Sequence, residues 1–299
     1  MRGAHAYFAG SGGIRLHYRC WDVTSPRAVV IVCHGLGEHS GRYAVLAQDF
    51  ARAGLSTYAL DHRGHGRSDG RKGHVRRFIS YVHDLEKFRR RVCGSVGLET
   101  PLFFLGHSLG GLILIRYLQE YRAVAARGAV LSAPLLGAAM DIPRWKQQLA
   151  RLLHYLVPAL PLNTGIAPEH LSHDREVVEA YKRDPLVHDR ITPRLYGEIL
   201  SEIEVAYRKA RRLHLPLLFL VPSEDKLVRP DLVQRYAATL GQRPRVQVET
   251  LAGLYHEALN ETTRSSVVAG VLGWIERQIT VYAPPRNGAG PAKSGGDGA

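Results

Sequence analysis

The chain has 299 residues, of which 45% are hydrophobic, and its 40 Lys and Arg against 27 Asp and Glu give a formal net charge of +13. This length and composition suit one large domain or two small ones with a buried core, which excludes a mostly disordered protein. No nucleic-acid-binding motif accompanies the positive charge, so we expect no nucleic-acid partner.

Short apolar runs that suit β-strands alternate with stretches of helical periodicity along most of the chain. Residues 4–9 and 14–21 flank the turn-rich sequence G-S-G-G and predict a β-hairpin. Apolar runs that suit strands buried on both faces follow at residues 28–33, 56–60, 102–105, 129–131, 217–221 and 246–249. Apolar side chains repeat at helical spacing over residues 78–92 and 112–118. The alternation predicts an α/β fold with a mostly parallel central sheet flanked by helices, and a ligand site at the carboxyl ends of the strands.

The alternation stops between about residues 135 and 212, which are helix-biased and interrupted by prolines. An insertion of this size after the sixth strand would cover the carboxyl edge of the sheet as a helical cap. The predicted organisation is therefore a core formed by residues 1–134 and 213–283, with residues 135–212 as the cap. Residues 284–299 are rich in Gly and Pro and carry no large apolar side chain, so a disordered tail is predicted there.

One apolar stripe in the predicted cap has helical spacing. It consists of Leu149, Leu152, Leu153, Leu156, Val157 and Leu160. Such a stripe could accept an acyl chain, dock on a bilayer, or pack against the core, and its pattern does not separate these roles.

The compartment is predicted from what the sequence lacks. The N-terminal residues contain no apolar stretch of the kind that a secretory signal requires, and residues 149–162, the longest apolar candidate for a membrane span, are interrupted by Arg151, His154 and prolines. A cytoplasmic protein is therefore expected. Basic segments such as residues 63–77 could bring it to anionic lipid headgroups, although a solvated arginine-rich surface is the favoured interpretation.

Cysteine spacing and cofactor motifs give no sign of a prosthetic group. Cys20, Cys33 and Cys93 are odd in number and widely spaced, which predicts neither a disulfide framework nor a cysteine-based metal site. Cys33 is expected to be a small buried core residue. There is no H-E-x-x-H and no G-x-G-x-x-G that opens a helix after a strand, so no metal or organic cofactor is predicted.

The strongest chemical signal is G-H-S-L-G at residues 106–110, which directly follows a predicted strand and directly precedes a predicted helix. This is the G-x-S-x-G nucleophile elbow in its expected context. Side chains at Gly106 or Gly110 would collide with the neighbouring strand and helix, and the serine of such a turn is strained. The helix that begins at Leu109 would direct its N-terminal amides at negative charge that develops near Ser108.

A serine hydroxyl is a weak nucleophile until a base takes its proton, so an acid and a histidine are expected downstream in that order. The sequence P-S-E-D-K-L-V after the strand predicted at 217–221 offers Asp225, with Glu224 as the alternative acid. His256 follows the next predicted strand and is the only histidine after His214.

Two backbone N–H groups would complete the site as an oxyanion hole. Leu109, the residue after the nucleophile, provides one, and Leu36, in the loop after the strand at 28–33, provides the other.

Six sequence blocks together resemble the monoacylglycerol lipase and lysophospholipase group of α/β-hydrolases. They are H-G-L-G-E-H-S-G-R-Y (34–43), D-H-R-G-H-G-R-S-D-G (61–70), G-H-S-L-G-G (106–111), D-P-L-V (184–187), S-E-D-K-L-V (223–228) and Y-H-E (255–257). The resemblance extends over roughly residues 5–280, and E-H-S-G-R-Y is its most discriminating part. It implies the α/β-hydrolase fold.

The resemblance also assigns residues. It implies Ser108 as nucleophile, Asp225 and His256 as its partners, and the oxyanion donors already named. It places Glu38 and Arg42 near the polar, glycerol-bearing end of the substrate, for which an internal ion pair that fixes the loop is the alternative. In the block at 61–70, Asp61, Gly64 and Gly66 are interpreted as loop-shaping residues.

The sequence thus predicts a serine carboxylester hydrolase of small lipid-like substrates, foremost a monoacylglycerol lipase that works through an acyl-enzyme. A lysophospholipase, or an esterase or thioesterase of shorter acyl groups, stays open. An aminopeptidase is disfavoured because the predicted cap shows no clustered acid placed for a substrate ammonium. A catalytically silent lipid-binding protein is disfavoured because all three proposed catalytic residues are present.

Overall fold

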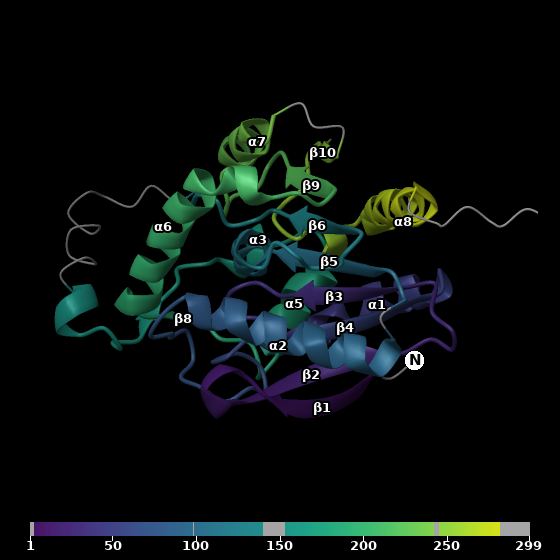
Figure 1. Ribbon diagram of the computed structural model, residues 1–299. Helices are drawn as coiled ribbons and strands as arrows, with labels where there is room; N and C mark the ends of the chain where they lie inside the picture. Colours follow the sequence, from purple (N-terminus) through teal and green to yellow (C-terminus); the bar gives the residue numbers. More distant parts are fainter. Residues whose placement is uncertain (1–2, 98, 140–152, 242–244, 282–299) are drawn as a thin grey trace, which may run out of the picture.

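The computed structural model describes residues 3–97, 99–139, 153–241 and 245–281. Across these residues an eight-stranded sheet has the order β1-β2-β4-β3-β5-β6-β9-β10, which can be followed from bottom to top in Figure 1. The strands are β1 (Ala4–Ala9), β2 (Arg15–Trp21), β3 (Ala28–Cys33), β4 (Leu55–Leu60), β5 (Leu102–His107), β6 (Gly128–Ser132), β9 (Leu217–Pro222) and β10 (Val246–Leu251). β2 pairs antiparallel with β1 and β4, and the pairs from β4 to β10 are parallel. The predicted hairpin and mostly parallel sheet are confirmed.

Helices cover both faces of this sheet. The α-helices that lie wholly within the described residues include α1 (Ala44–Arg52), α2 (Ile79–Val96), α3 (Leu109–Glu120), α5 (Arg175–Arg183), α6 (Pro193–Arg208), α7 (Pro230–Thr239) and α8 (Arg264–Val281). Short 3-10 turns are η1 (Ser11–Gly13), η2 (Ser40–Tyr43), η3 (Pro168–His170), η4 (Ala210–Arg212) and η5 (Ala258–Asn260).

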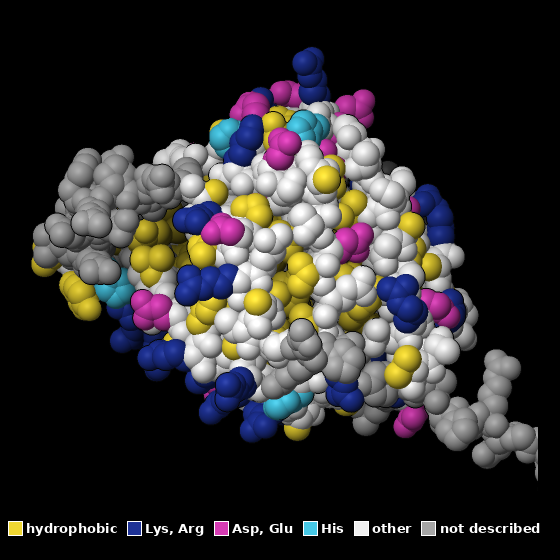
Figure 2. Space-filling model, turned by 90° about the horizontal axis from the view of Figure 1, so that it is seen from above, with side chains coloured by type: hydrophobic (Ala, Val, Ile, Leu, Met, Phe, Trp, Pro, Cys, Tyr) yellow, Lys and Arg dark blue, Asp and Glu magenta, His cyan; other side chains and the backbone are white. Residues whose placement is uncertain are grey.

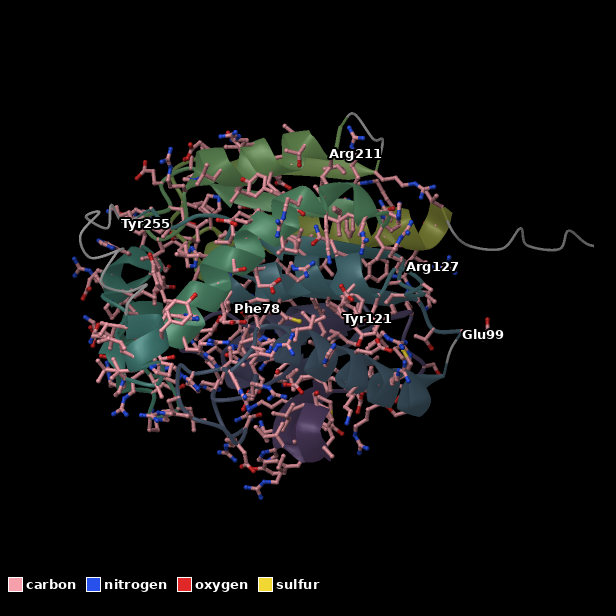
Figure 3. All side chains as sticks on the ribbon, turned by 60° about the vertical axis from the view of Figure 1, so that its left-hand side comes forward. Phe78, Glu99, Tyr121, Arg127, Arg211 and Tyr255 are labelled. Atoms are coloured by element: carbon pink, nitrogen blue, oxygen red, sulfur yellow. The ribbon has the colours of Figure 1, made fainter. Side chains whose placement is uncertain are left out.

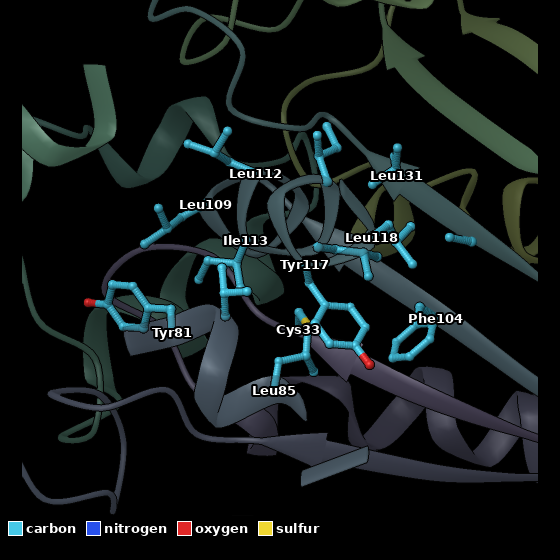
Figure 4. Packing of buried hydrophobic residues seen from close by; sticks show 14 of the residues in the cluster. Cys33, Tyr81, Leu85, Phe104, Leu109, Leu112, Ile113, Tyr117, Leu118 and Leu131 are labelled. Atoms are coloured by element: carbon cyan, nitrogen blue, oxygen red, sulfur yellow. The ribbon is translucent and has the colours of Figure 1, made fainter. Parts of the chain in front are cut away.

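Alternate side chains of the central strands enter two separate hydrophobic clusters. In β3, Ile31 and Cys33 pack with α2, α3 and α7, whereas Val30 and Val32 pack with α1 and α8. Figure 4 shows the first cluster, in which Cys33 and Phe104 from the sheet lie beside Tyr117 of α3. Burial on both faces explains why these strands are continuous apolar runs.

The last strand departs from that pattern. β10 was expected to be buried on both faces, but it lies at the edge of the sheet and Val248 is 42% exposed. Gln247 and Thr250 are exposed as well, because an edge strand has a neighbouring strand on one side only.

Between β6 and β9, the described residues hold η3, α5, α6 and η4 joined by turns and loops, together with a two-residue pairing of β7 (Leu162–Asn163) with β8 (Arg190–Ile191). Helix α6 ties this segment to the core. Glu202 on α6 pairs with Arg116 of α3 over 2.5 Å, and Glu198 accepts a 2.7 Å hydrogen bond from the Phe78 N–H just before α2. Phe78 is labelled in Figure 3.

Some sequence expectations fall outside what the structure describes. Leu149 and Leu152 of the predicted stripe lie outside the described residues, and so does the predicted tail at 284–299. Of the rest of the stripe, Leu153 is partly buried, while Leu156, Val157 and Leu160 are exposed.

Four buried histidines lie together beneath the carboxyl ends of β3 and β4. The His34 ring centroid is 4.3 Å from that of His62, and the His65 centroid is 4.8 Å from that of His188. Burial lowers the pKa of each of them, so these imidazoles stay neutral near pH 7.

In a His65→Asn variant, the free energy of unfolding is expected to fall less steeply than in the wild type as the pH decreases. An unfolded histidine gains its proton as the pH falls through 6.5, while burial lowers the pKa of folded His65 well below that value. The unfolded state therefore binds more protons, and each such histidine lowers the free energy of unfolding by up to about 1.4 kcal/mol per pH unit. Urea unfolding between about pH 6.5 and pH 5 should give a shallower slope for His65→Asn than for the wild type. Exposed His214→Asn is the control, and equal slopes for all three proteins would contradict the expectation.

Candidate active site

Ser108 occupies a sharp turn between β5 and α3. Its φ is 51°, a left-handed conformation that costs a non-glycine residue free energy and persists only where the surroundings enforce it. Its N–H donates to the Ser132 carbonyl over 3.0 Å, and its carbonyl accepts from the Leu135 N–H over 2.9 Å. The adjoining strand β6 thus holds the strained turn in place.

Two glycines let the helix approach the sheet closely at this turn. A Cβ on Gly106 would lie 2.8 Å from the Gly110 carbonyl oxygen, and a Cβ on Gly110 would lie 2.1 Å from the Cys33 carbonyl oxygen. The predicted collisions are therefore confirmed, one with the helix and one with β3.

An acid and a histidine meet at the same edge of the sheet. Asp225 follows β9 and His256 follows β10, and Asp225 Oδ2 lies 2.7 Å from His256 Nδ1. The other oxygen, Oδ1, accepts from the N–H groups of Leu227 and Val228 over 2.8 and 2.9 Å. Glu224, the alternative acid, is exposed to solvent.

The pKa of this histidine reflects two opposing effects. Burial alone would lower it, but the hydrogen-bonded Asp225 carboxylate outweighs burial and raises the pKa of His256 above its usual value. Asp225 stays ionised, because His256 and two backbone donors lower its pKa against the effect of burial.

Ser108 and His256 line the same pocket. No hydrogen bond joins them within the described residues, and such contacts commonly tighten only when substrate binds. Of the proposed oxyanion donors, Leu36 lines the pocket, and Leu109 follows Ser108 as the first residue of α3.

A buried cluster of charges lies beside the nucleophile. Arg42 donates to Glu38 over 3.0 Å and to both carboxylate oxygens of Glu257 over 2.6 and 2.8 Å. Glu38 also accepts from the Gly35 N–H over 2.6 Å, which braces the loop that carries Leu36. The alternative interpretation of Glu38 and Arg42, an internal ion pair, is therefore confirmed, and both residues also line the pocket.

Glu257 was not singled out from the sequence. It lies 215 residues from Arg42 in the chain, and only the folded sheet brings the two together. The sequence offered one indication of its role: Glu257 directly follows His256, so its backbone must lie close to the proposed catalytic base.

The segment that contains D-P-L-V holds the same loop from the other side. Asp184 Oδ2 lies 2.8 Å from His39 Nε2, and the His188 N–H donates to the Gly37 carbonyl over 2.9 Å. The Arg42 guanidinium lies 4.8 Å from the centre of the Tyr181 ring, in a cation–π contact.

Asp61 shapes the adjacent turn, as the sequence predicted. It accepts hydrogen bonds from the N–H groups of Ser40 and Arg67 over 2.7 and 2.9 Å. Cys33 is fully buried, and burial raises the pKa of its thiol, which agrees with the expected core role.

These elements enclose a pocket of about 540 Å³. Its charged end holds Glu38, Arg42 and Glu257 next to Ser108 and His256. The remaining wall is mostly apolar and includes Leu36, Leu135, Ile166, Leu171, Ile191, Ile199, Leu200, Ile203, Leu227 and Val228. Such a pocket suits a molecule with an apolar body and one polar end.

Two kinds of site are absent from the described residues. No group of three or more His, Cys, Asp or Glu is placed there to hold a metal ion. No described helix combines the length and apolar character needed to cross a membrane.

Comparison with known proteins agrees with this geometry. Residues 24–263 match a hydrolase family described as serine aminopeptidase, S33. The chain belongs to this family. Its fold is that of the α/β-hydrolases, and it is an ester hydrolase of the monoacylglycerol lipase-like kind.

Three relatives of this S33 chain show the range of similarity. A monoacylglycerol lipase of Mycolicibacterium smegmatis is 37% identical, over 90% of this chain and 95% of its own. A phospholipase of Bacillus subtilis is 28% identical, over 87% of this chain and 99% of its own. The crystal structure of a monoacylglycerol lipase of Paleococcus ferrophilus has a TM-score of 0.76 and 31% identity, and the match covers 93% of this chain and all of that one.

Gly110→Ala is expected to destabilise this S33 protein, because the new methyl group would overlap the Cys33 carbonyl. Overpacking of this kind typically costs about 1–3 kcal/mol of unfolding free energy. Gly94→Ala is the matched control: it lies on α2 with nothing within 4 Å of the new Cβ and should gain about 0.5–1 kcal/mol from helix propensity. Chemical denaturation measures both, and a stable Gly110→Ala variant would contradict the tight packing described above.

Proposed function

We propose that the protein is a monoacylglycerol lipase that hydrolyses its substrate through an acyl-enzyme on Ser108. The observation that carries the proposal is the pocket itself, in which an elbow serine and a buried His–Asp pair lie between a charged end and a long apolar wall. The similarity to proteins named monoacylglycerol lipases supports the same choice.

In the proposed reaction Ser108 Oγ attacks the ester carbonyl while His256 takes its proton. Asp225 holds the imidazole in orientation and stabilises its charged form. The N–H groups of Leu36 and Leu109 hold the oxyanion of the tetrahedral intermediate. His256 then donates the proton to the departing glycerol oxygen, and water releases the fatty acid from the acyl-enzyme by the same steps.

Each part of a monoacylglycerol finds a matching surface. The apolar wall suits the acyl chain, since burying each methylene group is worth roughly 0.8 kcal/mol. The glycerol hydroxyls would lie toward Glu38, Arg42 and Glu257, which offer both acceptors and donors.

Fatty-acid release from a long-chain monoacylglycerol tests the proposal. Ser108→Ala should abolish it, and Asp225→Asn should lower kcat by about 10⁴-fold because the imidazole loses its orientation. Glu224→Gln should stay within about twofold of the wild type, because its side chain points to solvent.

A substrate panel in the same assay separates the alternatives. Lysophospholipid and triacylglycerol with the same acyl group, and a short-chain thioester, should be cleaved more slowly than monoacylglycerol. Faster cleavage of lysophospholipid or thioester would keep the mechanism and replace the substrate class. No cleavage of any ester would overturn the proposal and favour a lipid-binding role.

We further propose that residues 135–212 act as a cap that docks peripherally on lipid surfaces. In its described part, Tyr155 is 80% and Leu156 67% exposed. Exposed Leu162 and Leu200 also line the pocket, so the apolar surface leads to the pocket mouth. Figure 2 shows apolar side chains gathered at the left-hand end of this face with Lys and Arg side chains nearby. A basic rim around an exposed apolar patch suits an anionic bilayer.

Leu156→Ser is expected to weaken binding to phosphatidylcholine vesicles that contain phosphatidylglycerol. Full burial of a leucine is worth about 1.5–3 kcal/mol, so partial insertion of this side chain corresponds to roughly a tenfold loss in partitioning. Val281→Ser removes a valine that is 73% exposed on α8, and it serves as the control. Vesicle sedimentation gives the partition coefficients, and equal values for both variants would rule out docking through this patch.

A further inference from the structure

The charged end of the pocket has more negative than positive charge. Glu38 and Glu257 are 4% exposed each, and the single guanidinium between them is that of Arg42. Although burial opposes ionisation, Arg42 lowers the pKa of both carboxyls, that of Glu257 to about 2. Two carboxylates and one guanidinium leave one uncompensated negative charge.

Among the described residues that line the pocket, no other Lys or Arg offsets that charge, because Arg42 is the only one. His107 faces the cluster, but burial lowers its pKa to about 4, so it is neutral near pH 7. The uncompensated charge therefore acts on whatever occupies this end of the pocket.

The cluster lies next to the reacting atoms. A Cβ added to Gly35 would lie 2.9 Å from Glu38 Oε1 and 3.3 Å from Ser108 Cβ. These two side chains therefore lie on either side of the space beside Gly35. Glu257 directly follows His256 in the chain. A group bound at Ser108 on this side of the pocket would therefore lie beside the cluster.

We propose that the surplus carboxylate of the Glu38–Arg42–Glu257 cluster is a specificity determinant, which admits neutral or cationic leaving alcohols and disfavours those that carry a phosphate. This inference rests on the proposed function and narrows its substrate class to esters of uncharged glycerol. A phosphate on the leaving alcohol would bring a second negative charge to within several ångströms of the cluster, in a partly water-excluded site. At an effective dielectric constant of about 20–40, that repulsion corresponds to about a tenfold discrimination or more.

The main experiment compares octanoylglycerol with octanoylglycerol phosphate, each below its critical micelle concentration, so that surface binding plays no part. The wild type should show a higher kcat/KM for octanoylglycerol, and Glu257→Gln should reduce the ratio of the two values about tenfold. The amide keeps the size of the side chain and one acceptor for Arg42.

Two matched variants separate charge from packing. Glu257→Asp keeps the charge and changes the geometry, and it should retain the wild-type ratio. Glu204→Gln removes one negative charge from an exposed position of α6 that does not line the pocket, and its ratio should also stay unchanged. A folded Glu257→Gln variant with the wild-type ratio would overturn the inference.

The pH profile of kcat/KM gives a second readout of the same charge. His256 Nδ1 is hydrogen-bonded to Asp225, and the centre of its ring lies 4.7 Å from that of His107. The negative charges of Glu38 and Glu257 also help raise the pKa of His256. Removing the Glu257 charge should move the acid limb of the profile to lower pH, whereas Glu257→Asp should leave it in place. A purely structural role for Glu257 predicts no difference between the two.

One measurement needs no variant, and so decides the case if Glu257→Gln does not fold. The wild-type kcat/KM is measured for two octanoyl esters. One is the ester of choline, and the other is the ester of the uncharged alcohol in which a carbon atom replaces the choline nitrogen. A preference for the choline ester larger than the ratio of the two hydroxide-catalysed hydrolysis rates supports the inference, and a preference equal to or smaller than that ratio overturns it. A wild type that cleaves this pair but not octanoylglycerol would contradict the proposed function alone.

Discussion

Arg42 is the contact on which the rest of the site depends, because it joins three segments that are distant in the sequence. Through Glu38 it holds the loop of Leu36, through Glu257 it holds the loop of His256, and its guanidinium packs on Tyr181 between β6 and β9. Burying a charge is costly unless it is paired and hydrogen-bonded, and here each charge has such partners. The arrangement therefore has little freedom to relax: a shift in one loop would leave a buried charge unpaired in another.

Much of the fold and part of the site could be predicted because they depend on local sequence. The elbow is specified within five residues, since the close approach of α3 to β3 excludes any side chain at Gly106 and Gly110. That Asp225 and His256 would meet followed from chain order, because the carboxyl ends of parallel strands share one edge.

The features that could not be predicted are set by contacts between distant segments. Nothing in the sequence around Glu257 indicates that it pairs with Arg42, because that contact exists only once the sheet has formed. The position of β10 at the edge depends on strand order, which apolar runs do not specify. The exposure of Leu156 likewise depends on where its helical turn lies on the core, and its spacing fits a buried stripe equally well.

The molecule separates its charges by depth. The whole chain has a net charge of +13, and a positive charge of this size would favour the proposed approach to anionic lipid layers, whereas the buried cluster in the pocket holds two carboxylates and one guanidinium. The two properties act on different events, arrival at an interface and choice of a molecule from it. A protein of this kind can gather at an anionic surface and still draw neutral lipid from it.

The long separation between the partners in the site also affects how the protein is made. Ser108 and its elbow belong to the first half of the chain, whereas the contacts of Asp225 with His256 and of Arg42 with Glu257 need residues near the other end. Synthesis proceeds from the N-terminus, so a ribosome-bound chain can carry the nucleophile long before its base has emerged. A chain that has emerged only as far as β6 would thus hold the proposed nucleophile without its base, and the two could meet only after residue 256 has emerged.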